Sequence, residues 1–256
     1  MALEALRAGK HVWVEKPLAL NVRDGRELVD AADAAGVILF VDETFLYDPM
    51  VREMKHRVEA GELGEIMHCS FERLGMGRIR RDSSVWWNSA PHDLSILFYL
   101  VPKPLAAVRM HLHAYLQDGI ADMAVADLEL EGGTSAHVYL SWLHPEKVAK
   151  VIVVGRKGML GYEGRFEQRA LVRYDYRVDL APPAPGAAAP IVPIEGFKGT
   201  PIEVPGGAEP LRLAAEHFVE SIAHGTEPLT SGARSLRVVE ALEAAERAAT
   251  RGGRIG

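Results

Sequence analysis

Two stretches of the sequence carry side chains whose types and spacing could oxidise an alcohol. Glu15-Lys16-Pro17 follows an apolar run, and Pro91-His92-Asp93 precedes another one. A lysine at the mouth of a strand can hold a hydroxyl group, and its charge makes that hydroxyl easier to deprotonate. A histidine titrates near neutrality and can take the proton when hydride leaves the carbon. Lys16 and His92 are therefore the candidate pair for proton transfer.

Structural interpretations compete with each of these roles. Lys16 could be a solvated lysine at a strand end, and His92 could be a core or surface histidine. Pro91 suits the first turn of a helix, so we expect His92 and Asp93 in that turn, where the helix dipole alone could favour Asp93. Trp87 and the tryptophan before it could stack on a sugar ring or anchor the core. The residues alone leave these alternatives open.

An α/β unit is predicted to position the first stretch. Residues 11–14 form a predicted strand that ends by Pro17, residues 22–35 a helix closed by Gly36, and residues 37–41 a second strand. This order with short connections predicts two parallel strands joined by a right-handed crossover. Ligands bind beyond the carboxyl ends of such strands. The polar residues at these two ends are Glu15, Lys16, Glu43 and Thr44.

The pattern changes after Asp48-Pro49, where one more helix (50–60) leads into strands rather than into another βα alternation. We expect a hairpin at Gly132-Gly133. The Pro-, Ala- and Gly-rich stretch 181–205 predicts an irregular surface excursion. The predicted strands are residues 65–73, 106–116, 124–130, 135–143, 149–154 and 170–176, and the predicted closing helices are 209–223 and 231–250.

Composition excludes several classes of partner. The 256 residues include 35 acidic and 29 basic ones, and this net charge of −6 gives no reason to expect nucleic acid or an anionic membrane surface. The single cysteine, Cys69, rules out an internal disulfide, and no apolar run approaches the roughly 20 residues of a membrane span. His111 and His113 would share a strand face but lack an evident third ligand, so no metal is expected. Without a secretory pattern, the cytoplasm is the expected location.

A phosphate-binding turn is the motif that the sequence does not offer. A dinucleotide-binding fold places glycines between its first strand and first helix, so that backbone amides can approach the pyrophosphate. Gly75-Met76-Gly77 has Arg80 where the third glycine should stand, and no apolar helix follows it. The segment 155–158 connects two strand-like segments and is predicted to be a turn.

Several motifs resemble those of one enzyme family. Ala8-Gly9-Lys10-His11-Val12 followed by Glu15-Lys16-Pro17 resembles the AGKHV…EKP signature of the Gfo/Idh/MocA oxidoreductases. Residues 62–66 resemble the join that opens the carboxy-terminal domain of that family, and residues 90–97 resemble its second catalytic motif. The resemblance covers essentially the whole chain. The branch acting on nucleotide-linked sugars is most similar at residues 141–147, 216–218 and 228–230.

The resemblance implies a fold, a reaction and an assembly. Residues 1–48 would be the remnant of a doubly wound parallel Rossmann domain. Residues 49–256 would form a larger substrate-binding domain with an open, mostly antiparallel sheet covered by helices. The implied reaction moves hydride between a carbon of a sugar or nucleotide-sugar and NAD or NADP, and the implied assembly is a homodimer or homotetramer through the open sheet face. The expected residues are Lys16 and His92 for catalysis; Glu15, Lys16 and Pro17 for the cofactor; and Glu43, Trp87, Asn88 and Asp93 for the substrate.

Two departures from the family pattern leave a second hypothesis open. Family members begin with a glycine-rich βα turn and about half a Rossmann domain, ahead of the point where Met1 falls. Asn88 stands where the family usually has an aspartate, four residues before His92. An amide can keep a hydrogen bond but carries no charge. The alternative is a catalytically silent or truncated homologue that serves as a dimerisation or ligand-binding module.

Overall fold

Two short parallel strands and two helices form the first unit of the chain. The computed structural model describes residues 1–165, 168–178, 194–206 and 209–251. The unit consists of α1 (Ala2–Arg7), β1 (Val12–Val14), α2 (Val22–Ala35) and β2 (Leu39–Val41). β1 and β2 run parallel with Val14 opposite Val41, so the predicted strand-helix-strand unit is confirmed.

The ends of α2 follow from its capping residues. The side chain of Asn21 accepts a hydrogen bond from the backbone N–H of Asp24 at 2.8 Å, which satisfies a free donor of the first turn. Gly36 ends the helix in the left-handed conformation with φ 63°, which a residue with a Cβ rarely adopts. Val29 and Ala32 are buried against the small sheet. The local sequence therefore fixes both the length of α2 and the face that it buries.

A tight connection leads from the small sheet to the rest of the chain. It contains the short 3-10 helix η1 (Thr44–Tyr47) and α3 (Pro49–Glu59). The side chain of Asp48 caps α3 by accepting a hydrogen bond from the N–H of Met50 at 2.9 Å. Leu46 and Tyr47 are buried, so η1 belongs to the main hydrophobic core.

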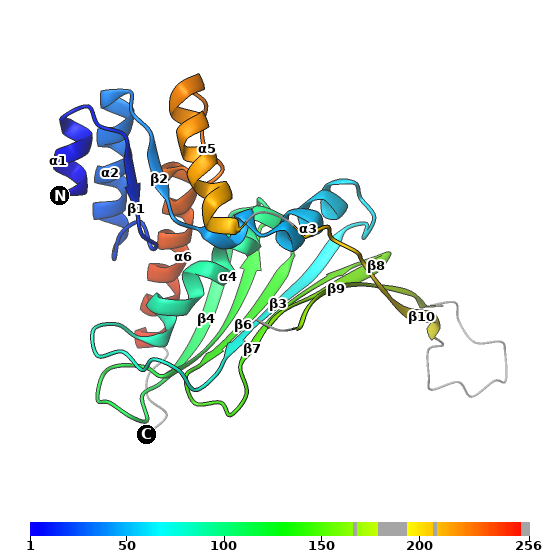
Figure 1. The fold of residues 1–256 in the computed structure, drawn as a ribbon. Coiled ribbons are helices and arrows are strands. Elements are labelled where there is room, and N and C mark those ends of the chain that lie inside the picture. Colours follow the sequence, from blue (N-terminus) through cyan, green and yellow to red (C-terminus); the bar gives the residue numbers. More distant parts are fainter. Residues whose placement is uncertain (166–167, 179–193, 207–208, 252–256) are drawn as a thin grey trace, which may run out of the picture.

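Eight strands form one large sheet in the order β10-β9-β8-β7-β3-β6-β5-β4 (Figure 1). Within this large sheet, only β3 and β6 pair in parallel among the described strands. The predicted fold class, a small parallel sheet followed by a larger and mostly antiparallel one, is confirmed. In chain order the strands are β3 (Ile66–Leu74), β4 (Leu105–His113), β5 (Met123–Leu130), β6 (Ser135–Ser141), β7 (Val148–Gly155), β8 (Gly158–Arg165), β9 (Gln168–Val178) and β10 (Ile194–Pro201).

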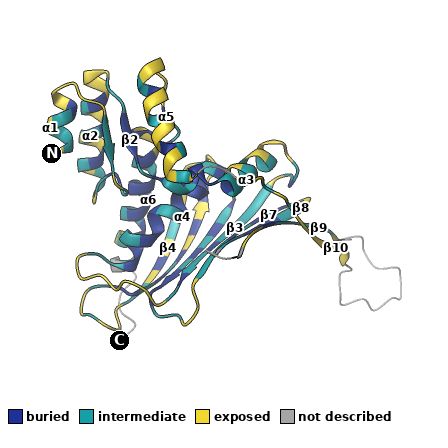
Figure 2. Cartoon of the chain, in the orientation of Figure 1, coloured by how far each residue is buried: buried dark blue, intermediate teal, exposed yellow. Residues whose placement is uncertain are grey.

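Helices cover one face of the large sheet and also reach the small one. α4 (Val85–Leu100) and α6 (Gly232–Arg251) lie over the sheet in Figure 1, and α5 (Pro210–His224) stands beside the small sheet. Figure 2 shows the buried residues concentrated between these helices and the sheet. Val239 of α6 belongs to the core of the first unit, whereas Leu242 belongs to the main core. α6 therefore fastens the two sheets to each other.

One expectation about the chain after β7 needs correction. The predicted irregular stretch 181–205 is wrong over Ile194–Pro201, because these residues pair with β9 as β10. β10 is exposed along its whole length at the sheet edge, which explains why its sequence lacks apolar alternation. The rest of that stretch up to residue 193 lies outside the described residues. The hairpin at Gly132-Gly133 and the turn at 155–158 are both confirmed.

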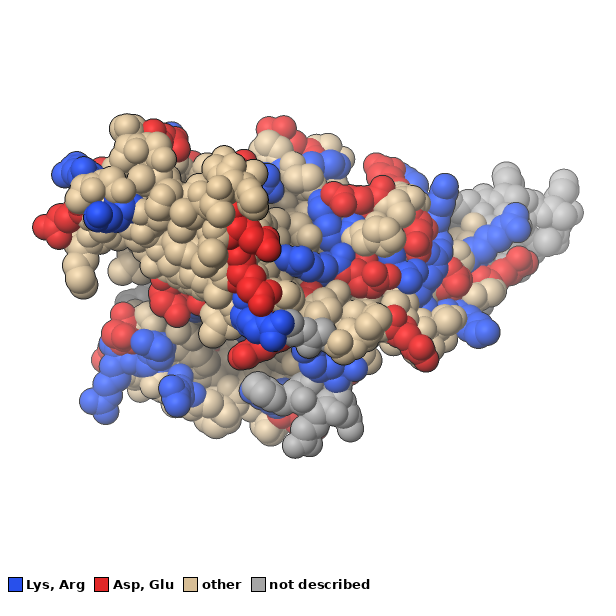
Figure 3. All heavy atoms as spheres, turned by 45° about the horizontal axis from the view of Figure 1, so that its top comes forward, with Lys and Arg blue, Asp and Glu red and all other residues tan. Residues whose placement is uncertain are grey.

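None of the described helices combines the length and the apolar character of a membrane-spanning segment. On the face shown in Figure 3, basic and acidic side chains are interspersed rather than gathered into areas of one sign. Many of the basic residues have acidic partners; for example, the Arg173 side chain pairs with both Glu62 and Asp175.

Candidate functional site

Lys16 lies at the carboxyl edge of the small sheet and reaches across to α4. β1 ends at Val14, so the next residues leave the sheet at the edge where ligands of parallel sheets bind. The Nζ atom of Lys16 donates a hydrogen bond to the backbone carbonyl of Asn88 at 2.8 Å. Burial lowers the pKa of Lys16, Arg73 and Arg80 lower it further, and Glu15 opposes the shift. Lys16 is therefore fixed in place and is not a freely solvated lysine.

The helix that carries His92 is longer than the sequence predicts. α4 begins at Val85, and Ser84 caps it by accepting a hydrogen bond from the N–H of Trp87. Pro91 lies inside the helix, so the prediction that His92 and Asp93 occupy its first turn is wrong. A proline has no N–H and cannot bond to the carbonyl of Trp87, four residues earlier. The helix is thus disturbed in the turn that faces Lys16.

His92 is held in a neutral form by its surroundings. Burial lowers its pKa well below the ordinary value, and the positive charges of Arg73 and Lys16 lower it further. The ring of Phe45 meets the imidazole edge-on, with centroids 4.8 Å apart. Nδ1 of His92 is buried and has no hydrogen-bond partner among the described residues. A neutral imidazole in this position can accept a proton.

Arg73 is a site residue that the sequence analysis missed. It forms two hydrogen bonds to the Asp93 carboxylate, from Nε at 3.2 Å and from Nη2 at 2.7 Å. The Asp93 side chain is only 1% exposed, and the guanidinium of Arg73 also lies 4.7 Å from the centre of the Phe45 ring. Alternation along β3 could have found it, because Cys69 and Phe71 point into the core and the next inward position is 73.

The remaining predicted residues divide into those near Lys16 and those away from it. Asn88 contacts Lys16 through its backbone, so the contact does not depend on the side chain at this position. Trp87 packs on the edge of the core, whereas its neighbour Trp86 is fully buried and donates from Nε1 to the carbonyl of Leu242 at 3.1 Å. Glu15 is exposed beside Lys16, and Pro17 is partly buried. The Asp93 carboxylate is committed to Arg73.

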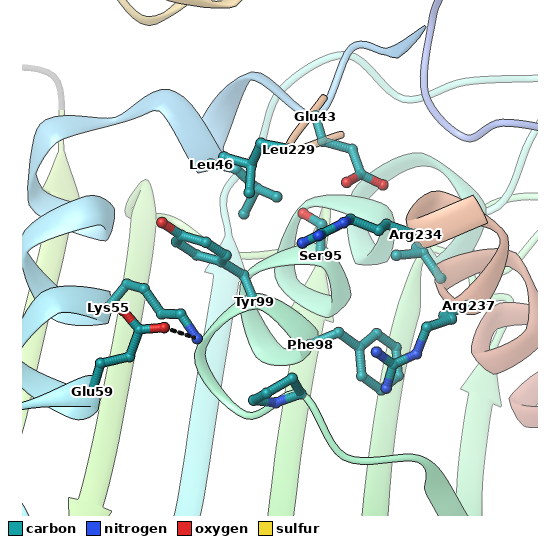
Figure 4. A pocket seen from close by; sticks show the side chains of 12 residues that line it. Glu43, Leu46, Lys55, Glu59, Ser95, Phe98, Tyr99, Leu229, Arg234 and Arg237 are labelled. Carbon is teal, nitrogen blue, oxygen red and sulfur yellow. Dashed lines mark ion pairs between the residues drawn. The ribbon is translucent and has the colours of Figure 1, made fainter. Parts of the chain in front are cut away.

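Glu43 lines a cavity of about 500 Å³, which we call the Glu43 cavity (Figure 4). Its side chain is 5% exposed, and burial raises its pKa to about 7, while Ser235 lowers it by a smaller amount. Neither Lys16 nor His92 lines this cavity. The lining residues are Glu43, Leu46, Lys55, Glu59, Ser95, Phe98, Tyr99, Pro102, Leu229, Arg234, Arg237 and Val238.

The histidines considered as metal ligands do not gather. His113 stacks on the ring of Tyr115 with centroids 5.4 Å apart. Across the part of the chain that the structure describes, no three His, Cys, Asp or Glu side chains are grouped as a metal ion requires.

Two family models match this chain in succession. Residues 1–43 match the NAD-binding Rossmann fold of the oxidoreductase family, and residues 51–161 match the GFO/IDH/MocA C-terminal domain. The first match covers the edge that carries Lys16, and the second covers α4 with His92.

Known proteins of this kind resemble the chain over most of its length. The scyllo-inositol 2-dehydrogenase (NAD(+)) of Bacillus subtilis is 24% identical over 90% of this chain, which spans 66% of that protein. The aldose-aldose oxidoreductase of Caulobacter crescentus superposes with a TM-score of 0.82 at 21% identity, covering 98% of this chain and 73% of the other. The WlbA dehydrogenase of Bordetella pertussis, in complex with NADH and UDP-GlcNAcA, gives a TM-score of 0.76 at 24% identity over the same shares.

The sequence motifs, the order of the two sheets and the successive family matches agree with one another. This chain belongs to the Gfo/Idh/MocA family of oxidoreductases.

Proposed function

We propose that this chain acts in an NAD(H)-dependent dehydrogenase that oxidises a secondary hydroxyl of a sugar, a cyclitol or a nucleotide-sugar. The observation that carries the proposal is the convergence of Lys16 and His92. Lys16 donates a hydrogen bond to the carbonyl of Asn88, one helical turn before His92, and its positive charge lowers the pKa of the imidazole. The family match and the inositol dehydrogenase relative support the same reaction class.

The two residues would divide the proton transfer between them. The ammonium of Lys16 donates a hydrogen bond to the substrate oxygen and favours its anionic form. His92 is neutral because burial and two cations oppose its protonation, so its imidazole has a free position for the hydroxyl proton. The same effects weaken it as a base, and the charge of Lys16 offsets this by lowering the pKa of the substrate hydroxyl. Phe45 and the Arg73–Asp93 pair hold the helix and the ring in position.

The residues at the carboxyl edge fit one end of a dinucleotide. Glu15 offers an exposed carboxylate and Lys16 an ammonium at the end of a parallel strand, and both groups can hold ribose hydroxyls. Pro17, the next residue, would contact the bound cofactor from the same turn. The nicotinamide, when bound, supplies the hydride acceptor. The choice between NAD and NADP is part of the proposal, and we assign NAD from the inositol dehydrogenase relative.

A spectrophotometric assay of NADH formation tests this function. This chain, and a version extended by any in-frame upstream sequence that supplies the glycine-rich turn, are each given NAD or NADP and scyllo-inositol, D-glucose or UDP-N-acetylglucosamine, and NADH binding is titrated in parallel. Turnover of at least one of these substrates with NAD by the extended version, and its loss in Lys16→Met and His92→Ala, is the expected result. NADH binding without turnover of any member of such a panel would favour the catalytically silent homologue instead.

We also propose that two copies associate through the face of the large sheet that the described helices leave uncovered. Arg109, Asp127 and His137 lie side by side across three strands on this face, and His137 pairs with Asp127 at 2.7 Å. Sedimentation of the wild type and of Arg109→Glu tests this part. A monomeric wild type would contradict it.

A further inference from the structure

The Glu43 cavity lies on the other side of η1 from His92. Phe45 of η1 contacts the imidazole, whereas Leu46 of the same short helix lines the cavity. Neighbouring residues of η1 therefore face His92 and the cavity. Its volume of about 500 Å³ lies in the range of small-molecule binding sites. Its walls come from segments far apart in sequence, between Glu43 and Val238.

Polar groups from four elements point into this cavity. Arg234 and Arg237 project from one face of α6, three residues apart, and Ser95 and Tyr99 project from one face of α4 (Figure 4). Lys55 enters from α3. Glu43 faces them from the residue before η1, with its carboxylate above Arg234 in Figure 4.

The internal contacts leave cationic donors for a ligand. Lys55 is neutralised by Glu59 at 3.1 Å. Arg237 donates from Nη2 to the carbonyl of Lys103 at 2.9 Å and stacks on Phe98 at 5.1 Å. These contacts use few of its five N–H groups.

Arg234 is also only partly engaged. Its Nε lies 3.4 Å from the Glu227 carboxylate, and its side chain is 57% exposed. The planar guanidinium group matches a carboxylate or a phosphate with two parallel hydrogen bonds. Two such groups on one helix face are therefore suited to an oxyanion.

Glu43 adds a second recognition element opposite the arginines. Burial disfavours its charged form, so the group is easily protonated and can then donate one hydrogen bond and accept another. The same carboxyl group can bind a hydroxyl of the ligand. Ser95 donates to the carbonyl of His92 at 2.9 Å, which leaves its hydroxyl oxygen as an acceptor in the cavity.

We propose that the Glu43 cavity is a second ligand site, which binds a small hydroxylated oxyanion through Arg234 and Arg237, with Glu43 on a hydroxyl group of the same ligand. The oxyanion is a carboxylate or a phosphate monoester. This site is separate from the Lys16–His92 site and does not depend on the dehydrogenase proposal.

Calorimetric titration of the protein without cofactor or sugar tests the site. The probes are L-malate, glycerol 3-phosphate and inorganic phosphate, with glycerol as the uncharged control. Malate carries only carboxylates and glycerol 3-phosphate only a phosphate ester, so the two probes distinguish these oxyanions. We expect one of these two to bind with a stoichiometry of one per chain and glycerol not to bind. Glycerol binding as tightly as either acid, or no binding by any oxyanion, would overturn the proposal.

Substitutions locate the bound probe. Arg234→Gln and Arg237→Gln each remove a charge-assisted pair and should weaken binding by about tenfold or more. The matched control is Arg212→Gln, which removes an arginine of α5 that is 67% exposed, against 57% for Arg234, and that pairs with Glu216 outside the cavity. Lys16→Met should leave probe binding unchanged.

Circular dichroism checks that each variant is folded. If Arg237→Gln does not fold, the result for Arg234→Gln is used to judge the proposal. Unchanged binding in Arg234→Gln would refute the assignment. Loss of binding in Lys16→Met would place the probe at the other site and refute it as well.

Discussion

Burial shifts the titrating groups on the two sides of η1 in opposite directions. On one side it lowers the pKa of His92, and Arg73 and Lys16 lower it further. On the other side it raises the pKa of Glu43 to about 7. In both cases the charged form loses its solvation, so the neutral form is favoured. One physical effect thus lowers the pKa of a base in one place and brings the pKa of an acid to about 7 in the other.

The neighbours explain why only one of the two groups titrates at neutral pH. His92 has two cations nearby, and both add to the effect of burial. Glu43 has Ser235 as its polar neighbour, which favours the ionised form and so opposes burial. The region around His92 is therefore fixed electrostatically, whereas the region around Glu43 can respond to pH or to a bound charge.

The largest expected effect is the loss of the base on the His92 side. His92→Ala should lower kcat by about 10² to 10⁴, because it removes the proposed proton acceptor. The fold should persist, and turnover is measured beside the unfolding curve. The matched control is His56→Ala, which removes an exposed histidine of α3. Equal kcat in both variants would remove His92 from the mechanism.

Breaking the Arg73–Asp93 ion pair beside His92 should lower the free energy of unfolding, in addition to any effect on turnover. Asp93 is 1% exposed, so Arg73→Leu leaves a buried carboxylate without its partner. We expect a loss of about 3 to 5 kcal/mol in the free energy of unfolding, measured in urea. Arg212→Leu, at a pair with a 67% exposed arginine, should cost about 1 kcal/mol or less.

The double variant Arg73→Met/Asp93→Leu separates a buried charge from a lost packing contact. It should recover most of the stability lost in Arg73→Leu, because no unpaired charge remains. If the double variant is as unstable as Arg73→Leu, the pair does not hold this side of η1 electrostatically.

On the other side, Glu43→Gln should change the dependence of stability on pH. The pKa of Glu43 is raised from 4.5 to about 7 on folding, so its contribution is present below pH 4.5 and is lost as pH rises through 7. The variant cannot ionise and should be more stable than wild type at pH 8, by on the order of 3 kcal/mol. Near pH 4.5 the two should be similar. Parallel stability curves across this range would show that Glu43 is not shifted.

The sequence could predict Lys16, but not the Arg73–Asp93 pair that packs beside His92. Lys16 was found because a strand end and a family motif coincide at one place. Arg73 was missed although strand alternation points it inward, because the sequence alone does not show that Asp93 lies opposite. The start of α4 was placed too late because Pro91 suits a first turn, whereas Ser84 is the actual cap.

The Glu43 cavity could not be predicted from the sequence. Glu43 was correctly recognised as a polar residue after a strand, but its burial depends on α4 and on the segment before α6. The carbonyl of Thr230 accepts a hydrogen bond from the N–H of Val41 at 2.9 Å, which brings the start of α6 beside β2. A contact between residues so far apart in sequence leaves no local pattern. The same reason hides Arg234 and Arg237 as neighbours of Glu43.

The smallest expected effect comes from Asn88→Asp, which adds a carboxylate on the His92 side of η1, where the nearby charges are positive. A carboxylate one helical turn before His92 favours the charged imidazole and should raise its pKa only modestly, because Arg73 and Lys16 remain. The hydrogen bond from Lys16 should survive, since it goes to the backbone carbonyl of residue 88. Stability should change by about 0.5 kcal/mol or less. Titration of the His92 ring by NMR measures the shift without requiring turnover. An unchanged pKa in the variant would mean that the new carboxylate does not act on the imidazole, and the His92 region would then be fixed by its packing rather than by its charges.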